Sequence, residues 1–377
     1  MRKIMFFAEA NRENIVGTVS QLDVKKDEVV MILLGEENIP DIDGMISDLN
    51  EMGIHFFGGI FPGLIHGESE HSKGAVIRKM PGILEPVAIN IKNPDHIEIP
   101  DFTELLNSES RKKHTAIILI DGMAPNIGLF LSEMLNRLGN SVNYFGAGAG
   151  YRNMKKDLCL FSSEGFVNNS AIVVLVKLES CLGVRHGWKK IMGPLVATRT
   201  DRNVINEFNW ENAFEVYREA VEKDSGKKFS ENNFYDIAKE YPLGLFREGS
   251  EDIGRATVAL TPDGAIVCGG EVHNNAVVYI LGEKKESLIK SAQMAAEDCR
   301  IPEDRRICLC IVADCISRAL LLESRFPEEL KAISRGIQPA CSDEIPEGIL
   351  TLGEISSLGE RYLEYLNLTT VVAVMYE

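Results

Sequence analysis

The sequence predicts an α/β fold of mixed α+β character, in which repeated strand–helix–strand units form mixed sheets flanked by helices. The main observation is that one order of elements (strand, polar turn, helix, strand, glycine-rich turn) occurs three times. The 377 residues correspond to two or three domains at about 150 residues each. Apolar residues amount to 45% and charged residues to 25%, which is typical of a globular protein. We expect two domains, residues 1–208 and 209–377.

The first unit begins at residues 29–34 (VVMILL), an apolar run that predicts a buried strand. A helix is predicted next, because apolar residues recur at helical spacing: Ile42, Met45, Ile46, Leu49 and Met52. Gly53 follows this stripe at a position where glycine commonly ends a helix. A second apolar run, residues 54–63 (IHFFGGIFPG), completes the unit with a strand and a glycine-rich turn.

The second unit has its first strand at residues 116–120 (AIILI) and its second at residues 142–150 (VNYFGAGAG). Gly139 ends the helix between them. The apolar face of that helix consists of Ile127, Phe130, Leu131, Met134, Leu135 and Leu138. Residues 159–176 follow this unit and predict a hairpin ending in a buried strand.

The third unit comprises a strand at residues 307–313, a helix beginning near Ile316, and a strand with its glycine turn at residues 348–354 (GILTLGE). Residues 362–376 predict a second hairpin that ends in a buried strand. The similar order of elements in all three units indicates duplicated segments that share a core.

Further strands and helices are predicted between units two and three. Residues 183–199 suggest strands, and residues 256–268 predict a hairpin around a Pro-Asp-Gly turn. Residues 280–299 predict an amphipathic helix. Another helix is predicted after Asn209 as its N-cap, with a buried stripe of Trp210, Phe214, Tyr217 and Val221.

Composition excludes several classes of protein. The 40 basic and 56 acidic residues give a net charge of −16, which disfavours non-specific nucleic-acid binding. The longest apolar runs, such as residues 171–176, are far shorter than the roughly 20 residues of a membrane span. The N-terminal apolar segment is too short for a signal peptide, so we expect a cytoplasmic protein. Eight cysteines in a chain of this length do not indicate a disulfide scaffold.

Gly146, Gly148 and Gly150 form a G-A-G-A-G sequence after a strand. A dinucleotide site would require a helix directly afterwards, whereas residues 151–157 (YRNMKKD) lead into another apolar run. Two interpretations stay open, because the permissive backbone of glycine suits both of them. The glycines serve sharp turns and close packing, or they let a ligand approach the backbone.

Asp121 and Asp314 end corresponding strands of units two and three. Such carboxylates cap the next helix or, at this edge of an α/β sheet, contact a ligand. Cys315 and Arg318 follow Asp314 closely, and the three residues are expected to face one opening. An arginine there suits the carboxylate or phosphate of a ligand.

Two other residues support alternative functions. His186 lies in a turn rich in glycine and aromatic residues, where it either belongs to a surface turn with Trp188 packed inward or contacts a ligand such as haem. Cys315 is the best candidate for a catalytic nucleophile, but its histidine base cannot be placed. Cys308, Cys310 and Cys315 lack zinc-site spacing, so no metal is expected.

Five segments together resemble the FIST domain, a sensory module of bacterial and archaeal signalling proteins with an N-terminal and a C-terminal half. They are YFGAGAG (144–150), GVRHGWKKIMGP (183–194), ADCISRALLLESRF (313–326), EGILTLGEIS (347–356) and YLEYLNLTTVV (362–372). The resemblance implies a protein that binds a small ligand, with amino acids or related metabolites as candidates, and signals to kinases or cyclases. It also implies an alternative function, in which the protein binds haem and senses nitric oxide. Because only AVMYE follows Val372, we expect the output to be a separate partner protein.

The leading hypothesis is therefore a stand-alone sensor for an anionic or zwitterionic, amino-acid-like metabolite, without a cofactor or a catalytic residue. The glycine turns of successive units are expected to form the walls of one polar-rimmed cavity. An alanine at Arg318 is expected to abolish binding without unfolding the protein. The candidate ligand-binding residues are Asp121, Asn126, Gly146, Gly148, Gly150, Arg152, His186, Asp314, Cys315, Arg318, Gly353 and Glu354. A haem sensor that uses His186 and an enzyme that uses Cys315 remain the alternatives.

Overall fold

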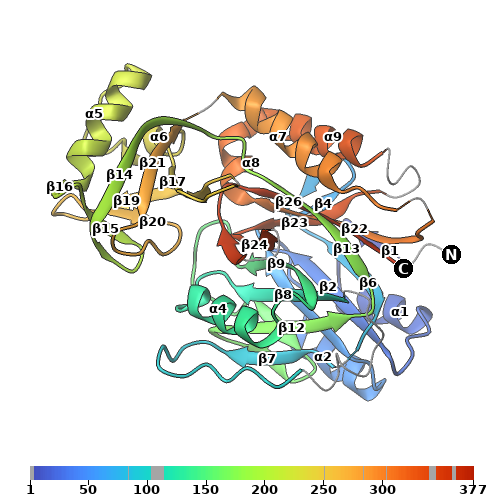
Figure 1. Cartoon of the computed structure of the whole chain (residues 1–377). Coiled ribbons are helices and arrows are strands. Elements are labelled where there is room, and N and C mark those ends of the chain that lie inside the picture. The colour runs from blue at the N-terminus through green and yellow to red at the C-terminus, as the bar shows by residue number, and fades with distance from the viewer. Residues whose placement is uncertain are drawn as a thin grey trace.

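The protein is described here by a computed structural model with three six-stranded mixed sheets and a smaller lobe (Figure 1). The described residues are 4–83, 85–102, 114–249, 251–282, 284–302, 304–338, 345–358 and 362–377. In this part of the chain, no helix is both long and apolar enough to cross a membrane.

The predicted threefold repeat is confirmed, because each unit forms two parallel strands joined by helices. A parallel pair requires a long crossover, which the helices supply. Unit one consists of β2 (Glu28–Gly35), α2 (Ile42–Glu51) and β3 (Phe56–Phe61). Unit two consists of β8 (His114–Asp121), α4 (Ile127–Leu138) and β9 (Val142–Ala149). Unit three consists of β22 (Ile307–Cys315), α8 (Ile316–Leu322), the 3-10 turn η1 (Glu323–Arg325), α9 (Phe326–Ile337) and β23 (Glu347–Thr351).

Each unit then extends the sheet of a different unit with a hairpin. The hairpin of unit one joins the sheet of unit three, that of unit two joins the sheet of unit one, and that of unit three joins the sheet of unit two. The hairpins are β4 (Gly63–His66) with β5 (Ser69–His71), β10 (Leu160–Ser162) with β11 (Gly165–Val167), and β24 (Glu354–Leu358) with β25 (Tyr362–Leu366). The exchange is cyclic, so each sheet contains strands from two units.

After its hairpin, each unit returns to its own sheet. The returning strands are β6 (Ala75–Pro81), β12 (Ser170–Val176) and β26 (Thr370–Tyr376), and the strands beside them are β1 (Ile4–Phe7), β7 (Val87–Asn90) and β13 (Glu179–Arg185). The expectation that residues 362–376 form one hairpin is wrong, because β25 pairs with β24 while β26 pairs with β22 and β13. Similarly, the hairpin and the final strand within residues 159–176 belong to different sheets.

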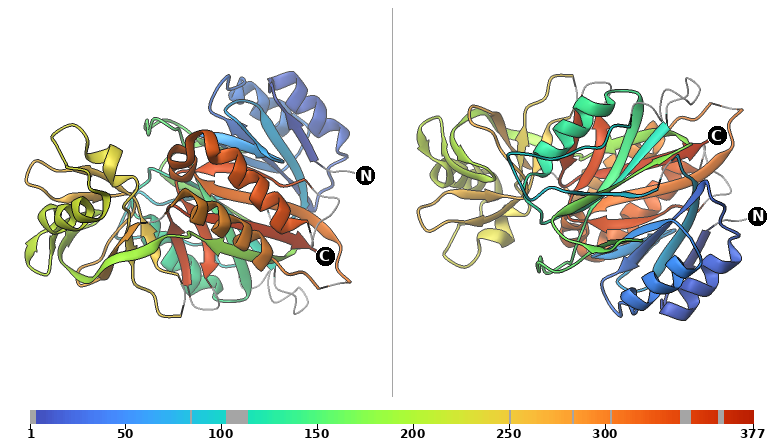
Figure 2. Two further views of the ribbon diagram at one scale, coloured as in Figure 1. Left: turned by 90° about the horizontal axis from the view of Figure 1, so that it is seen from above. Right: turned by 90° about the horizontal axis from the view of Figure 1, so that it is seen from below.

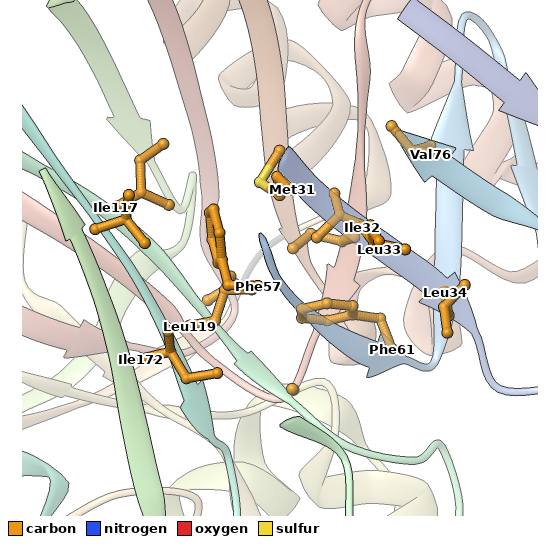
Figure 3. Packing of buried hydrophobic residues seen from close by; sticks show 14 of the residues in the cluster. Met31, Ile32, Leu33, Leu34, Phe57, Phe61, Val76, Ile117, Leu119 and Ile172 are labelled. Atoms are coloured by element: carbon orange, nitrogen blue, oxygen red, sulfur yellow. The ribbon is translucent and has the colours of Figure 1, made fainter. Parts of the chain in front are cut away.

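The three sheets direct their inner faces toward one shared core. On β8, Ile117 and Leu119 belong to this central cluster, whereas Ile118 and Ile120 pack on the side of α4, which is the period-two alternation of a strand. Figure 3 shows Phe57 of unit one beside Ile117 and Leu119 of unit two. The outer faces are covered by helices: α1 (Arg12–Gln21) and α2, α4, and α7 (Lys285–Asp298) with α9.

A separate lobe is inserted between β13 and α7 and projects from the body (Figures 1 and 2). It contains β14 (Lys189–Asp201), β15 (Val204–Phe208), β16 (Glu211–Asn212), α5 (Ala213–Ser225), α6 (Phe234–Ala238), β17 (Leu243–Leu245), β18 (Ile253–Arg255), β19 (Thr257–Leu260), β20 (Ile266–Cys268) and β21 (Val277–Gly282). The boundary predicted after Phe208 falls at the end of β15, inside this sheet. The two halves of the chain also share sheets through the exchanged hairpins.

Local predictions in the lobe are partly confirmed. The hairpin at residues 256–268 exists as β19 and β20. The helix predicted after Asn209 instead begins after Asn212, whose side-chain oxygen accepts the N–H groups of Phe214 and Glu215. Trp210 therefore precedes the helix and is 81% exposed. The helix predicted from residue 280 begins only at Lys285, because β21 occupies the preceding residues.

Candidate ligand site at the ends of the repeated units

The glycine-rich turns of the units come together, as the sequence predicts. The N–H of Gly148 donates to the carbonyl of Gly353 at 2.7 Å, and the N–H of Leu352 donates to the carbonyl of Gly148 at 2.9 Å. The N–H of Gly150 donates to the carbonyl of Ile60 in unit one at 2.9 Å. The ends of all three units therefore meet at one place, which we call the glycine junction (Ile60, Gly148, Gly150, Leu352 and Gly353).

The side chains of Tyr365 and Leu352 pack against these turns, in the region where an open cavity is expected from the sequence. A Cβ at Gly353 would lie 2.3 Å from Cζ of Tyr365, and one at Gly148 would lie 2.3 Å from the Tyr365 hydroxyl. A Cβ at Gly150 would lie 2.5 Å from Cδ1 of Leu352. Gly146 lies deeper in the sheet, against the Ile118 carbonyl. Of the two interpretations of the glycines, the geometry favours close packing.

Tyr365 is a residue that the sequence analysis missed. Its side chain is 7% exposed, and its hydroxyl has no hydrogen-bond partner within the described ranges. Burial raises the pKa of Tyr365, and the nearby Glu354, Cys315 and Asp121 raise it further. A buried hydroxyl without a partner is unfavourable, so Tyr365 is a residue whose polar atom the surrounding described residues do not use. A tyrosine within the strand YLEYL gives no sequence signal of this kind.

Two predicted site residues serve the packing around the junction. The Asp121 carboxylate accepts the N–H groups of Met123 at 3.0 Å and Asn169 at 3.2 Å, so it stabilises a turn and does not cap α4. The Asn126 amide donates to the carbonyls of Ile91 and Lys92. Both residues therefore fix backbone segments.

Arg152 lies on the unit-one side of the junction. Its backbone N–H donates to Glu36 at 2.8 Å, and its guanidinium binds the Glu70 carboxylate. The side chain is 38% exposed. Arg152 is consequently engaged with two acidic residues and lies apart from the other predicted cations.

Arg318 does not face an opening, contrary to the prediction. It is fully buried, and its Nε and Nη2 donate to the two oxygens of Glu329 at 3.0 and 2.7 Å. Its other hydrogen bonds reach the backbone carbonyls of His186, Leu368 and Leu288. This enclosure leaves no donor directed at a solvent-accessible ligand, so Arg318 stabilises the junction between α7, α8 and α9.

Asp314, Cys315 and Glu354 are buried beside Arg318. Burial and the nearby Glu329 raise the pKa of Asp314, and burial raises the pKa of Glu354 to about 8. The Glu354 carboxyl accepts hydrogen bonds from the Thr351 hydroxyl and from the Thr369 N–H. Burial also raises the pKa of the Cys315 thiol, which opposes its use as a nucleophile.

His186 is 5% exposed and lies at the edge of the same cluster. Its Nδ1 accepts the N–H of Trp188 at 2.8 Å, and its Nε2 lies 3.7 Å from the Glu251 carboxylate. Burial lowers the pKa of the imidazole. A haem requires an apolar slot beside its axial ligand, whereas Nε2 faces an acidic side chain, so these surroundings do not fit a haem ligand. Trp188 packs inward, as expected.

A second group of polar side chains with incomplete hydrogen bonding lies where β18 of the lobe runs beside β25. Arg255 is 6% exposed, and its hydrogen-bond acceptors among the described residues are backbone carbonyls, those of Glu271, Gly254 and Tyr365. Asn367 is 3% exposed, and its Oδ1 has no partner within the described residues. We call this region the lobe seam (Arg255, Gly269, Gly270, Tyr365 and Asn367).

Comparison with known families decides what kind of protein this is. The FIST N domain model matches residues 16–211, and the FIST C domain model matches residues 213–357. The chain belongs to the FIST family. FIST domains are small-ligand sensory domains of signal transduction. No curated protein gives a significant match.

The FIST matches cover the glycine junction fully and the lobe seam in part. Gly148 belongs to the FIST N match and Gly353 to the FIST C match, so the glycine junction joins the halves. Arg255 lies within FIST C, whereas Tyr365 and Asn367 follow the matched region. No sequence pattern distinguishes Arg255 from the other arginines, since its hydrogen bonding to backbone carbonyls arises only on folding.

Proposed function

We propose that this FIST protein is a sensor that binds a small carboxylate-bearing, amino-acid-like metabolite at the lobe seam. The signal would pass to a separate protein such as a kinase or cyclase. The observation that carries the proposal is a buried guanidinium, that of Arg255, without an ion-pair partner among the described residues. The sensory role of the family supports the same conclusion.

The chemistry of the seam matches a zwitterion. A buried cation without a carboxylate in ion-pair contact is costly, and burial lowers the pKa of Arg255, while the more distant Glu364 and Glu271 raise it. The carboxylate of a ligand would supply the missing charge through charge-assisted hydrogen bonds. Asn367 Oδ1 is an unpaired acceptor that suits an ammonium group. The glycines at 269 and 270 bring the backbone against these two side chains, since a Cβ at either would lie within 3.2 Å of them.

The position of the seam is also suited to signalling. Arg255 of the lobe donates to the Tyr365 carbonyl on the edge strand β25, and the Tyr365 hydroxyl reaches the glycine junction. A ligand held there would contact the lobe and the body together. Binding would then favour one placement of the lobe over others, which is how a ligand shifts a conformational equilibrium.

The Arg255→Gln variant tests this proposal. Thermal-shift screening with the twenty standard amino acids and succinate should identify a stabilising compound for the unaltered protein. Calorimetry with that compound should then show about a 10- to 100-fold weaker affinity for the variant, because a charge-assisted pair contributes about 1.5–3 kcal/mol. Arg199→Gln, at an exposed arginine of the lobe, is the matched control and should bind normally. Stabilisation by none of the probes, or equal affinity of the Arg255 variant, would contradict the proposal.

The Tyr365→Phe variant gives a second, milder test. It removes only a hydroxyl that has no hydrogen-bond partner in the described structure, so the urea midpoint should stay the same or rise slightly. If the ligand extends along the seam to this hydroxyl, its affinity should fall while the stability does not. A large loss of stability would show instead that the hydroxyl is engaged within the protein.

A further inference from the structure

Two cysteines distant in sequence meet on the outer side of the third sheet. Cys181 lies on β13, and Cys299 follows the last residue of α7. The Cys299 thiol donates to the Cys181 carbonyl at 3.5 Å and to the Val372 carbonyl at 3.3 Å. The Cys181 thiol donates to the Asp298 carbonyl at 3.7 Å. Both thiols are reduced, Cys181 being partly exposed and Cys299 buried.

The backbone holds these two elements in unusually close contact. A Cβ at Gly183 would lie 1.7 Å from the Ala295 carbonyl, so α7 approaches β13 with no side chain between them. Arg185 also binds the Asp298 carboxylate at 2.8 Å. The end of α7 is therefore fixed against β13 beside the pair.

The two thiols differ in pKa. Such a difference is typical of a pair in which one cysteine attacks an oxidant and the other then closes the disulfide. A hydrogen bond from Cys299, assisted by the N–H groups of Arg300 and Leu182, lowers the pKa of Cys181 to about 7 despite its partial burial and the nearby Asp298. The bond to Cys181 and burial raise the pKa of Cys299. A partly exposed thiolate is the reactive form of cysteine.

We propose that Cys181 and Cys299 form an oxidation site for hydroperoxides, which closes a reversible disulfide between β13 and the end of α7. The Cys181 thiolate attacks the hydroperoxide, an S–O bond forms, the O–O bond breaks, and an alcohol or water leaves after protonation. Cys299 then loses its proton and attacks the sulfenic sulfur, so that the S–S bond forms and the S–O bond breaks with release of water. One hydroperoxide is reduced as two thiols are oxidised.

Hydrogen peroxide is the probe in the first experiment, which uses the complete chain without substitutions. Brief treatment at neutral pH should yield one cross-linked peptide pair, Cys181 with Cys299, in a non-reducing peptide map, and dithiothreitol should remove it. Without peroxide, iodoacetamide should label Cys181 at least tenfold faster than the buried Cys315. Equal labelling of the two cysteines would overturn the proposal.

Variants separate the two roles. Cys181→Ser should abolish the cross-link, whereas Cys299→Ser should leave a sulfenic acid at Cys181 that dimedone traps. Cys308→Ser, at a partly exposed cysteine of β22, is the control and should keep the cross-link. A wild-type protein that accumulates sulfenic acid at Cys181 without linking it to Cys299 would contradict the proposed pair. None of these measurements depends on the metabolite site.

Discussion

The Arg318→Ala variant is expected to lose about 3–5 kcal/mol of stability, because it leaves buried acidic groups without their cation. Arg318 binds both oxygens of Glu329, and its Nε lies 3.4 Å from Asp314. Three further hydrogen bonds of Arg318 join three backbone segments to α8. Urea denaturation should show a clearly lowered midpoint.

Two further variants show whether the effect comes from burial of the charges. Arg325→Ala removes a partly exposed arginine with ion pairs to Glu286 and Glu328, and it should change the stability by less than about 1 kcal/mol. Arg318→Met combined with Glu329→Gln should recover part of the lost stability, since the unpaired carboxylate of Glu329 is also removed. An Arg318→Ala protein of normal stability that no longer binds its metabolite would restore the direct ligand role expected from the sequence.

The Glu354→Gln variant is expected to be more stable than the unaltered protein at pH 8, and to differ little from it at pH 5. Burial raises the pKa of Glu354 from 4.5 to about 8, so the folded protein binds a proton there that the unfolded chain releases. Stability from this group is therefore complete below pH 4.5 and is lost as the pH rises toward 8. The loss is on the order of 3 kcal/mol between pH 5 and 7.5, since each pKa unit corresponds to about 1.4 kcal/mol.

A glutamine reproduces the shape of the protonated carboxyl without a titrating proton. Its amide can donate to the Thr351 hydroxyl, which lies 3.4 Å from the Asp314 carbonyl and can donate to it. The measurement is the urea midpoint of both proteins from pH 5 to pH 8. Glu219→Gln, at an exposed position on α5, is the control and should leave the pH profile unchanged. Parallel pH profiles of the urea midpoint for the Glu354 variant and the unaltered protein would contradict the binding of a proton by Glu354 in the folded state.

Local structure was accessible from the sequence wherever periodicity and end signals agree. The apolar spacing of residues 42–52 and Gly53, which has a φ of 68°, define α2, and Gly139 with a φ of 54° ends α4. These features depend on neighbours within one or two turns. The helix near Asn209 was misplaced by a few residues, because a second asparagine at 212 provides the actual cap.

The candidate site was only partly predictable. The convergence of the glycine turns followed from the repeat, because corresponding turns of similar units lie at corresponding ends of their sheets. The roles of Tyr365, Arg255 and Asn367 did not follow. An unpaired polar atom is a property of its surroundings, and the surroundings of Arg255 include Tyr365, which is 110 residues away.

The three strand–helix–strand units, their glycine ends and the membership of the FIST family were all evident before folding was considered, since apolar periodicity and motif order are local properties of a chain. Three features follow only from the folded arrangement: the hairpins exchange between sheets, Arg318 is enclosed, and Arg255 donates to backbone carbonyls instead of an ion-pair partner. The partners of Arg318 lie 132, 50 and 30 residues away, at His186, Leu368 and Leu288. Whether a charged side chain meets solvent, a carboxylate or a carbonyl is therefore fixed by packing between distant segments, which no local pattern encodes.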